Sequence, residues 1–222
     1  MAFNIAIDGP AGAGKSTIAR ALAKRLSYIY VDTGAMYRAM ALYLLRENIS
    51  ADDSGRIEKA CESVDISIIH EDGVQKVLLN GEDVSSLIRS EEVGNMASAS
   101  AQNGRIREKL VELQRQLAAK TDVVMDGRDI GTCVLPDADV KIYLTASVHT
   151  RAVRRFKEYL EKGMEADLAQ IEADIEKRDH QDMSREISPL NKAEDAVLLD
   201  SSDMTIEEVL DAMTAVCGKK KS

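Results

Sequence analysis

Residues 9–17 read Gly9-Pro10-Ala11-Gly12-Ala13-Gly14-Lys15-Ser16-Thr17, follow the apolar run Ile5–Asp8 and open a helical pattern. They fit the motif G-x-x-x-x-G-K-[ST], in which glycines let successive backbone N–H groups turn toward an anion. The helix that begins at Lys15 points its positive end at phosphates. Lys15 would lie near the β- and γ-phosphates, and the Ser16 hydroxyl can hold Mg²⁺. The stretch therefore predicts a site for a nucleoside triphosphate formed by all nine residues.

The rest of the chain alternates apolar runs with helical patterns. Five apolar runs, several of them nearly continuous in Ile, Val, Leu and Tyr, are Phe3–Asp8, Tyr28–Asp32, Val123–Asp126, Val140–Thr145 and Ala196–Asp200. The helical patterns cover Lys15–Ser27, Ala35–Glu47, Gly104–Ala119, His149–Lys162 and Thr205–Val216. Continuous apolar strands are typical of parallel sheets covered on both faces. The sequence predicts an α/β fold: a P-loop NTPase-like, doubly wound, five-stranded parallel sheet with helices on both faces.

Two segments interrupt this alternation. Val64–His70 and Val74–Leu79 flank Glu71-Asp72-Gly73, and Asn80-Gly81 follows directly. Asp-Gly and Asn-Gly are strong turn signals, so these residues predict a small antiparallel hairpin inserted into the α/β order. Gly163–Asp167 interrupts a charged helical region and could form the hinge of a mobile cap.

Composition narrows the class of protein. The 222 residues carry 29 basic and 38 acidic side chains, a formal charge of −9, which argues against a binder of nucleic-acid backbones. Cys61, Cys133 and Cys217 are scattered and odd in number, as expected of buried thiols in a reducing compartment. The sequence shows no signal peptide and no apolar run of membrane-spanning length. We expect a cytoplasmic monomer that binds small molecules, and neither nucleic acid nor a membrane.

Polar residues follow two of the predicted strands where ligands bind in such sheets. Thr33 and Arg38 come after Asp32, while Arg128 and Asp129 come after Asp126. Arginines at strand ends also serve as surface ion-pair partners, but two such sites near a phosphate-binding loop favour anion binding.

Further arginines lie in the charged helical region. Arg178, Asp182 and Arg185 are spaced i, i+4 and i+7, which places them on one stripe of a helix, where a solvated ion-pair stripe is the alternative. Arg151, Arg154 and Arg155 form a basic cluster that could close over phosphates or simply be a charged helix face.

So many arginines suit an acceptor that is itself a phosphate. Two unit negative charges 4 Å apart repel by about 4 kcal/mol at an effective dielectric near 20, and arginines offset that repulsion. A phosphate nucleophile has its second pKa near about 6 and is mostly dianionic at neutral pH, so it needs no general base. The sequence predicts a phosphotransferase with a small phosphorylated acceptor.

At these residues the chain resembles bacterial cytidylate kinases of the nucleoside monophosphate kinase family. The resemblance runs almost from end to end, through IAIDGPAGAGKST (Ile5–Thr17), VDTGAMYR (Val31–Arg38), LNGEDVSSLIR (Leu79–Arg89), VGNMAS (Val93–Ser98), DGRDIGT (Asp126–Thr132), RAVRR (Arg151–Arg155) and RDxxDxxR (Arg178–Arg185). The phosphate-binding loop alone is not specific for the family, but this combination in this order is. One departure is Gln181, where some relatives carry another arginine.

The resemblance implies phosphorylation of CMP and dCMP to CDP and dCDP by direct in-line transfer, with ATP as donor and Mg²⁺. It implies a single kinase domain over residues 1–222 with its core at 1–62, 104–150 and 186–222. It also implies a monophosphate-binding insert at about 63–103 and a helical lid at about 151–185.

The resemblance also assigns roles to individual residues. The expected catalytic residues are Lys15, Arg128, Arg185 and Arg154. The expected acceptor contacts are Arg38, Arg128 and Arg185 at the phosphate, Ser98, Arg107 and Asp129 at cytosine, Thr33 near the acceptor, and Arg178 and Asp182 near the sugar. A carboxylate accepts from the exocyclic amine of cytosine, whereas uracil has an oxygen there.

Two alternatives stay open at this point. One is a kinase for another small phosphorylated acceptor, such as UMP. The other is a P-loop GTP switch protein, since the motif serves many functions. Such switches read guanine with an NKxD motif, but the nearest string, Asn191-Lys192-Ala193-Glu194, lacks the Asp.

Overall fold

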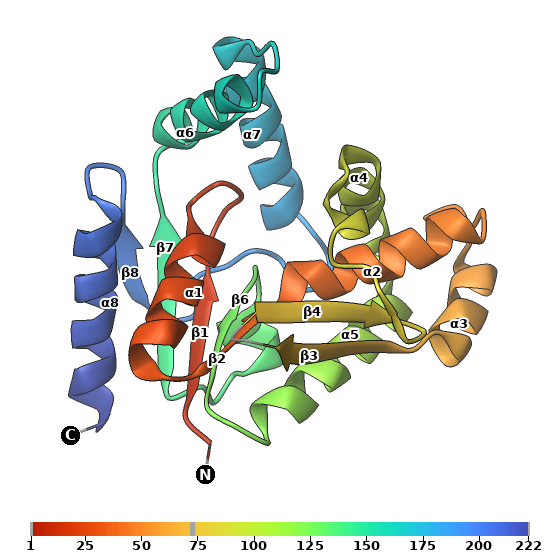
Figure 1. The fold of residues 1–222 in the computed structure, drawn as a ribbon, viewed down its shortest axis with the longest axis horizontal. Helices are drawn as coiled ribbons and strands as arrows, with labels where there is room; N and C mark the ends of the chain where they lie inside the picture. The colour runs from red at the N-terminus through yellow and green to blue at the C-terminus, as the bar shows by residue number, and fades with distance from the viewer. Residues whose placement is uncertain (1, 72–73, 222) are drawn as a thin grey trace. The chain divides into compact units, whose positions relative to one another are not determined.

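The computed structural model describes residues 2–71 and 74–221. The chain forms two compact units (Figure 1), which we call the helical unit and the sheet unit. The helical unit is built on Val31–Thr121, and the sheet unit comprises Phe3–Tyr30 and Asp122–Ser222. Within the described part of the chain, no helix is both long and apolar enough to cross a membrane.

The sheet unit is organised by a five-stranded parallel sheet in the order β2-β6-β1-β7-β8. Its strands are β1 (Asn4–Asp8), β2 (Ile29–Asp32), β6 (Val123–Asp126), β7 (Val140–Thr145) and β8 (Val197–Asp200). In the central register Ile7 pairs with Asp126 and Asp8 pairs with Tyr143. The predicted parallel strands are confirmed, with bounds within one residue of those expected.

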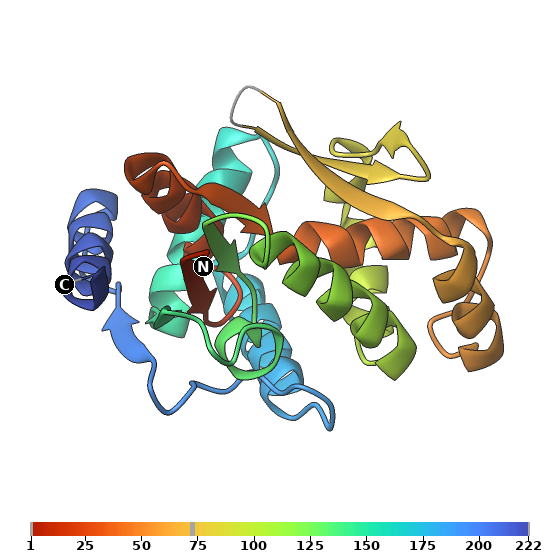
Figure 2. The ribbon, with the colours of Figure 1, turned by 90° about the horizontal axis from the view of Figure 1, so that it is seen from below.

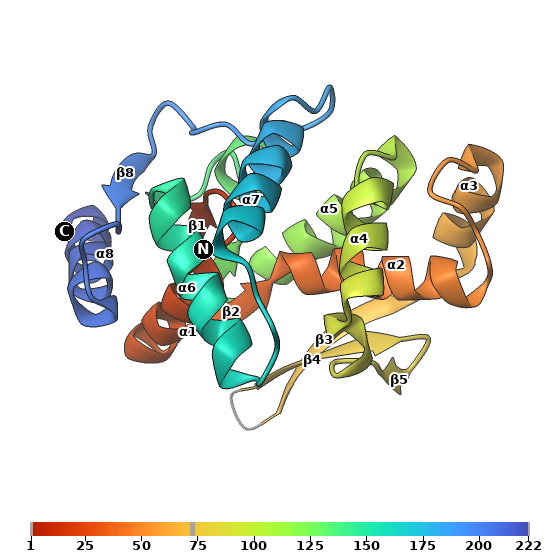
Figure 3. The same cartoon turned by 90° about the horizontal axis from the view of Figure 1, so that it is seen from above.

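The α-helices of the sheet unit are α1 (Lys15–Leu26), α6 (Val148–Glu161), α7 (Leu168–Met183) and α8 (Ile206–Lys221), and a short π-helix, η2 (Ile130–Val134), follows Asp129. Helices α1 and α8 lie side by side (Figures 1 and 2) over a core that includes Ile5, Leu22 and Met213. Helices α6 and α7 pack together (Figure 3) around Ala152, Ile171 and Ile175. The predicted interruption between them is present, while α8 runs five residues beyond the predicted end at Val216.

The helical unit contains α2 (Thr33–Arg46) and the elements that follow it in the chain. They are α3 (Ser54–Ser63), β3 (Ile66–Glu71), β4 (Val74–Leu79), β5 (Glu82–Asp83), the 3₁₀ turn η1 (Leu87–Arg89), α4 (Glu91–Ser100) and α5 (Gly104–Ala118). The predicted antiparallel hairpin is confirmed as β3 and β4, and its expected turn at Asp72-Gly73 lies outside the described residues. Asn80-Gly81 turns the chain with positive φ at both residues into β5, a strand the sequence analysis did not predict.

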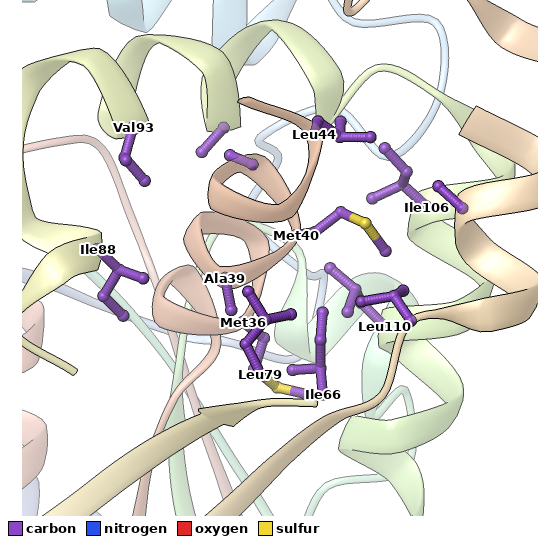
Figure 4. Packing of buried hydrophobic residues seen from close by; sticks show 14 of the residues in the cluster. Met36, Ala39, Met40, Leu44, Ile66, Leu79, Ile88, Val93, Ile106 and Leu110 are labelled. Atoms are coloured by element: carbon purple, nitrogen blue, oxygen red, sulfur yellow. The ribbon is translucent and has the colours of Figure 1, made fainter. Parts of the chain in front are cut away.

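The core of the helical unit lies along one face of α2 (Figure 4). Met36, Met40 and Leu44 recur at helical spacing and are each at most 1% exposed. The hairpin contributes Ile66 and Leu79 to this cluster. Helix α5 adds Ile106 and Leu110. Long unbranched methionine side chains fill the irregular space between a helix and a small sheet.

Met40→Ala should lower the free energy of unfolding by about 2–5 kcal/mol, because it empties a fully buried position. Met164→Ala is the matched control, since Met164 is 50% exposed, and it should change that free energy by less than about 0.5 kcal/mol. Urea unfolding followed by circular dichroism measures both variants. An equal loss of unfolding free energy in both variants would contradict the packing of Met40 in the core of the helical unit.

Candidate active site

The phosphate-binding loop connects β1 to α1. Gly9, Gly12 and Gly14 have φ values of 148°, 76° and 83°, a region that side chains disfavour. A Cβ on Gly9 would lie 1.9 Å from the Leu144 carbonyl oxygen, so only glycine fits there. No side chain caps the N-terminus of α1, and its first turn carries no acidic residue. The first backbone N–H groups of α1 are therefore suited to an anion.

Lys15 is buried at the base of this loop. Its Nζ donates to the Pro10 carbonyl oxygen at 2.7 Å. Burial lowers the pKa of Lys15 well below its ordinary 10.5, and the charge of Arg128 lowers it further. An anion at the loop would favour the charged form of Lys15 again. The side chain is thus placed to respond to a phosphate.

Two aspartates end the neighbouring strands β1 and β6. Asp126 accepts hydrogen bonds from Ser16 Oγ at 2.8 Å and from the Tyr30 hydroxyl at 2.9 Å. Asp8 accepts from the backbone N–H groups of Ile130 and Gly131, both at 2.7 Å. Burial raises the pKa of Asp8 to about 6, although these N–H groups act to lower it. Asp8 thereby links the start of the phosphate-binding loop to the segment that follows Arg128.

The Ser16–Asp126 pair fits Mg²⁺. Hydroxyl and carboxylate oxygens are the hard ligands that Mg²⁺ prefers, and it usually takes one or two carboxylates plus substrate phosphates. The described residues contain no group of three or more His, Cys, Asp or Glu side chains arranged to hold a metal. The Ser16 hydroxyl and the Asp126 carboxylate are oxygen donors that would hold Mg²⁺ together with phosphate oxygens.

Arg128 and Arg185 meet at one carboxylate. Arg128 Nε donates to Asp182 Oδ2 at 2.9 Å, and Arg185 Nη2 donates to Asp182 Oδ1. The Asp182 side chain is 1% exposed. Burial alone would raise its pKa, but the charges of Arg128, Arg185 and Arg178 outweigh burial and hold the pKa below 3.8.

The predicted helical stripe is wrong for one member of this group. Helix α7 ends at Met183, so Arg185 lies beyond it. The chain leaves the helix at Ser184 and still returns Arg185 to Asp182. The ion pair with Asp182, and not helical spacing, therefore holds Arg185 beside that carboxylate.

The arginines of the basic cluster on α6 differ in their hydrogen-bond partners. Arg151 is 3% exposed and donates to Ala146, Ala11 and Asp179. Arg154, expected to be catalytic, donates to the Ser201 carbonyl oxygen at 2.7 Å. Its part in catalysis stays a prediction. Among the described contacts, Arg151 and Arg154 share no hydrogen-bond partner.

Other predicted residues belong to the helical unit. Thr33 opens α2 and is buried, and Arg38 Nη1 lies 3.5 Å from the Ile88 carbonyl oxygen. Ser98 is on α4, which packs against α2. Arg107 on α5 is 5% exposed, and its guanidinium lies 5.7 Å from the Tyr37 ring centre.

The predicted set is thus divided between the two units. The sheet unit holds the loop, Lys15, Arg128, Asp129, Arg154, Arg178, Asp182 and Arg185. The helical unit holds Thr33, Arg38, Ser98 and Arg107. Asp8, Asp126 and Asp179 were not among the predicted site residues. Asp126 could have been found, because a carboxylate that ends a strand beside a P-loop strand is a common Mg²⁺ ligand.

Asp182→Asn should destabilise the protein by about 3 kcal/mol at neutral pH, because it leaves two partly buried arginines without their counter-ion. Since the folded-state pKa of Asp182 lies below 3.8, its stabilisation is complete above about pH 4 and is lost as the pH falls through the folded-state pKa. The difference from the wild type should shrink accordingly below about pH 4. Unfolding curves at several pH values measure it.

Asp174→Asn is the control for this prediction, since Asp174 lies on the same helix and accepts only an exposed Gln170 bond in its described contacts. It should change the unfolding free energy by less than about 0.5 kcal/mol. A similar loss in both variants would contradict the role of Asp182 as a buried anchor.

Two solved structures superpose on the chain at low sequence identity. An uncharacterized protein from Eubacterium ventriosum superposes with a TM-score of 0.56 at 12% identity, covering 99% of both chains. A gluconokinase from Sinorhizobium meliloti gives a TM-score of 0.50 at 12% identity, covering 98% of this chain and 92% of that one. These similarities support the fold alone.

Curated relatives are much more similar in sequence. A cytidylate kinase from Lactobacillus johnsonii is 53% identical over 219 residues, covering 99% of this chain and 95% of the relative. A cytidylate kinase from Carboxydothermus hydrogenoformans is 51% identical over 218 residues, covering 98% of each chain. The family model described as cytidylate kinase matches residues 5–219. The chain therefore belongs to the cytidylate kinase family.

Proposed function

We propose that this chain transfers the γ-phosphoryl group of ATP to CMP and dCMP, giving ADP and CDP or dCDP. The observation that carries the proposal is that Arg128 and Arg185 meet at Asp182 in the same unit as the phosphate-binding loop. One unit thus supplies a backbone cradle for one phosphate group and paired guanidinium groups for another. Membership of the cytidylate kinase family supports the nucleotides named.

The donor side of the proposed site is the loop Gly9–Thr17. Its backbone N–H groups and the N-terminus of α1 would surround the donor phosphates, and Lys15 would leave the Pro10 carbonyl to reach the β- and γ-phosphates. Ser16 and Asp126 would hold Mg²⁺. When bound there, Mg²⁺ would offset the negative charge that develops during transfer.

The acceptor side would use Arg38, Arg128 and Arg185 against the CMP phosphate. A dianionic phosphate oxygen attacks the γ-phosphorus while the bond to the β–γ bridging oxygen breaks, and that oxygen leaves on ADP. No proton needs to be removed from this nucleophile, since its second pKa is near about 6. The protein's contribution is alignment and charge compensation. Arg154 is proposed as a further cation for the transfer.

Base and sugar recognition completes the proposal. Asp129 would accept from the cytosine amine, and Ser98 and Arg107 would bind the remaining polar edge of the base. Arg178 and Asp182 would contact the sugar, and Thr33 would lie near the acceptor. The burial of Arg107 and Asp129, 5% and 6% exposed, supports fixed positions for these groups.

Larger parts of the chain also belong to the proposal. Residues of about 63–103 would form a monophosphate-binding insert, and about 151–185 a lid, supported by the hairpin β3–β4 and by the small separate core of α6 and α7. A monomeric state and a cytoplasmic location are also part of the proposal.

A panel of CMP, dCMP, UMP, AMP, GMP and dTMP with ATP and Mg²⁺ tests the function through coupled detection of ADP. CMP and dCMP should react fastest, with UMP at least about 100-fold lower in kcat/KM, since a buried polar group facing the wrong partner discriminates strongly. Faster turnover of a purine monophosphate would refute the proposal. Tight GTP binding with slow hydrolysis and no need for a monophosphate would instead identify a switch protein.

A further inference from the structure

Arg151 and Asp179 form a buried ion pair to which the proposed reaction assigns no role. Arg151 is on α6 and Asp179 is on α7, and they are 3% and 8% exposed. Two guanidinium nitrogens of Arg151 face the two carboxylate oxygens, at 2.6 and 3.1 Å. Breaking such a bidentate pair leaves a charge buried without its partner.

The same guanidinium also holds the phosphate-binding loop. Arg151 Nη1 donates to the Ala11 carbonyl oxygen at 2.9 Å, and Nε donates to the Ala146 carbonyl oxygen at 2.9 Å. In a trans peptide the carbonyl and the next N–H point in opposite directions. Fixing the Ala11 carbonyl toward Arg151 therefore turns the Gly12 N–H away from Arg151. That N–H is one of the loop groups that would face the donor phosphates.

The backbone at Gly12 agrees with this arrangement. Gly12 has φ 76°, and a Cβ built on it would lie 3.5 Å from Arg151 Cβ. The loop thus passes close to Arg151 in a conformation that glycine adopts readily. Arg151 also donates four hydrogen bonds to three protein partners, which leaves at most one of its five guanidinium N–H groups for a phosphate.

Helix α7 connects the two sides of the proposed site. Asp179 and Asp182 are three residues apart, so they lie on neighbouring positions of one helix face. Asp179 holds Arg151 and through it the loop, while Asp182 holds Arg128 and Arg185. One helix therefore anchors both the loop and the paired arginines.

We propose that Arg151 and Asp179 are a positioning pair that sets the orientation of the phosphate-binding loop, so that Arg151 acts on ATP through the Ala11 peptide and not by contact with phosphate. The pair thereby affects the affinity for ATP and not the affinity for the acceptor. This inference rests on the proposed function for the identity of the donor.

Asp179→Asn separates this proposal from direct phosphate binding. If Arg151 positions the loop, weakening its partner should weaken Mg·ATP binding about tenfold or more, as expected when a charge-assisted hydrogen bond is lost. KM for ATP should rise in parallel, with KM for CMP changed less than about twofold. If Arg151 contacts phosphate directly, releasing it from Asp179 should leave ATP binding equal or tighter. That result would overturn the proposal.

Calorimetric titration with Mg·ATP and no acceptor gives the affinity, and steady-state kinetics give both KM values. The matched control is Glu172→Gln, which weakens the exposed His149–Glu172 contact between the same two helices without touching the loop. It should leave ATP affinity unchanged. An equal loss of ATP affinity in the control would also overturn the proposal, because it would show general loosening of α6 and α7.

The double variant Arg151→Met with Asp179→Leu keeps the test valid should a single variant fold poorly. It removes both charges, and buried pairs replaced by apolar residues commonly fold well. The folded double variant should bind Mg·ATP about tenfold or more weakly, because the Ala11 carbonyl has lost its donor. Wild-type ATP affinity in this variant would refute the positioning role. Failure of the wild type to phosphorylate CMP would refute the proposed function instead, since ATP binding is measured separately.

Discussion

Buried aspartates that hold cationic side chains in place are the constraint on which the sheet unit depends. Asp182 holds Arg128 and Arg185, and Asp179 holds Arg151. Taking such charges out of water is costly, so each cation needs a partner when no phosphate is bound. The carboxylates meet that need and fix the guanidinium groups before a ligand arrives. An overall acidic chain, with a formal charge of −9, can thereby keep a local anion site.

The groups that would bind the donor phosphates are likewise held by protein partners. Lys15 donates to the Pro10 carbonyl, and Ser16 donates to Asp126, so both groups have protein partners that ligands can replace. Asp8 binds the backbone after Asp129 through two N–H groups, which joins β1 to the segment that carries Arg128. In the proposed reaction this prior alignment lowers the barrier, because charged groups do not need to reorganise during transfer.

Local patterns predicted the sheet well and the helical unit only in part. The parallel strands are short and mainly apolar runs, and the loop at residues 9–17 has a fixed spacing of glycines and lysine. Helices α3 and α4 were missed, because they are short and bury mainly small side chains such as Ala60 and Ala97. Asp8 and Asp179 were missed because their partners lie on other elements: Ile130 is 122 residues from Asp8, and Arg151 is 28 residues from Asp179. Arg185 was misplaced because an ion pair decided its position.

A crystal structure with CMP, Mg²⁺ and a non-hydrolysable ATP analogue tests the central claim most directly. The account predicts donor phosphates within about 3 Å of the N–H groups of Gly12 and Gly14, and the CMP phosphate within about 3 Å of Arg128 and Arg185. Arg151 should keep its contact with Asp179. An acceptor phosphate bound away from Arg128 and Arg185, or donor phosphates away from the loop, would contradict it.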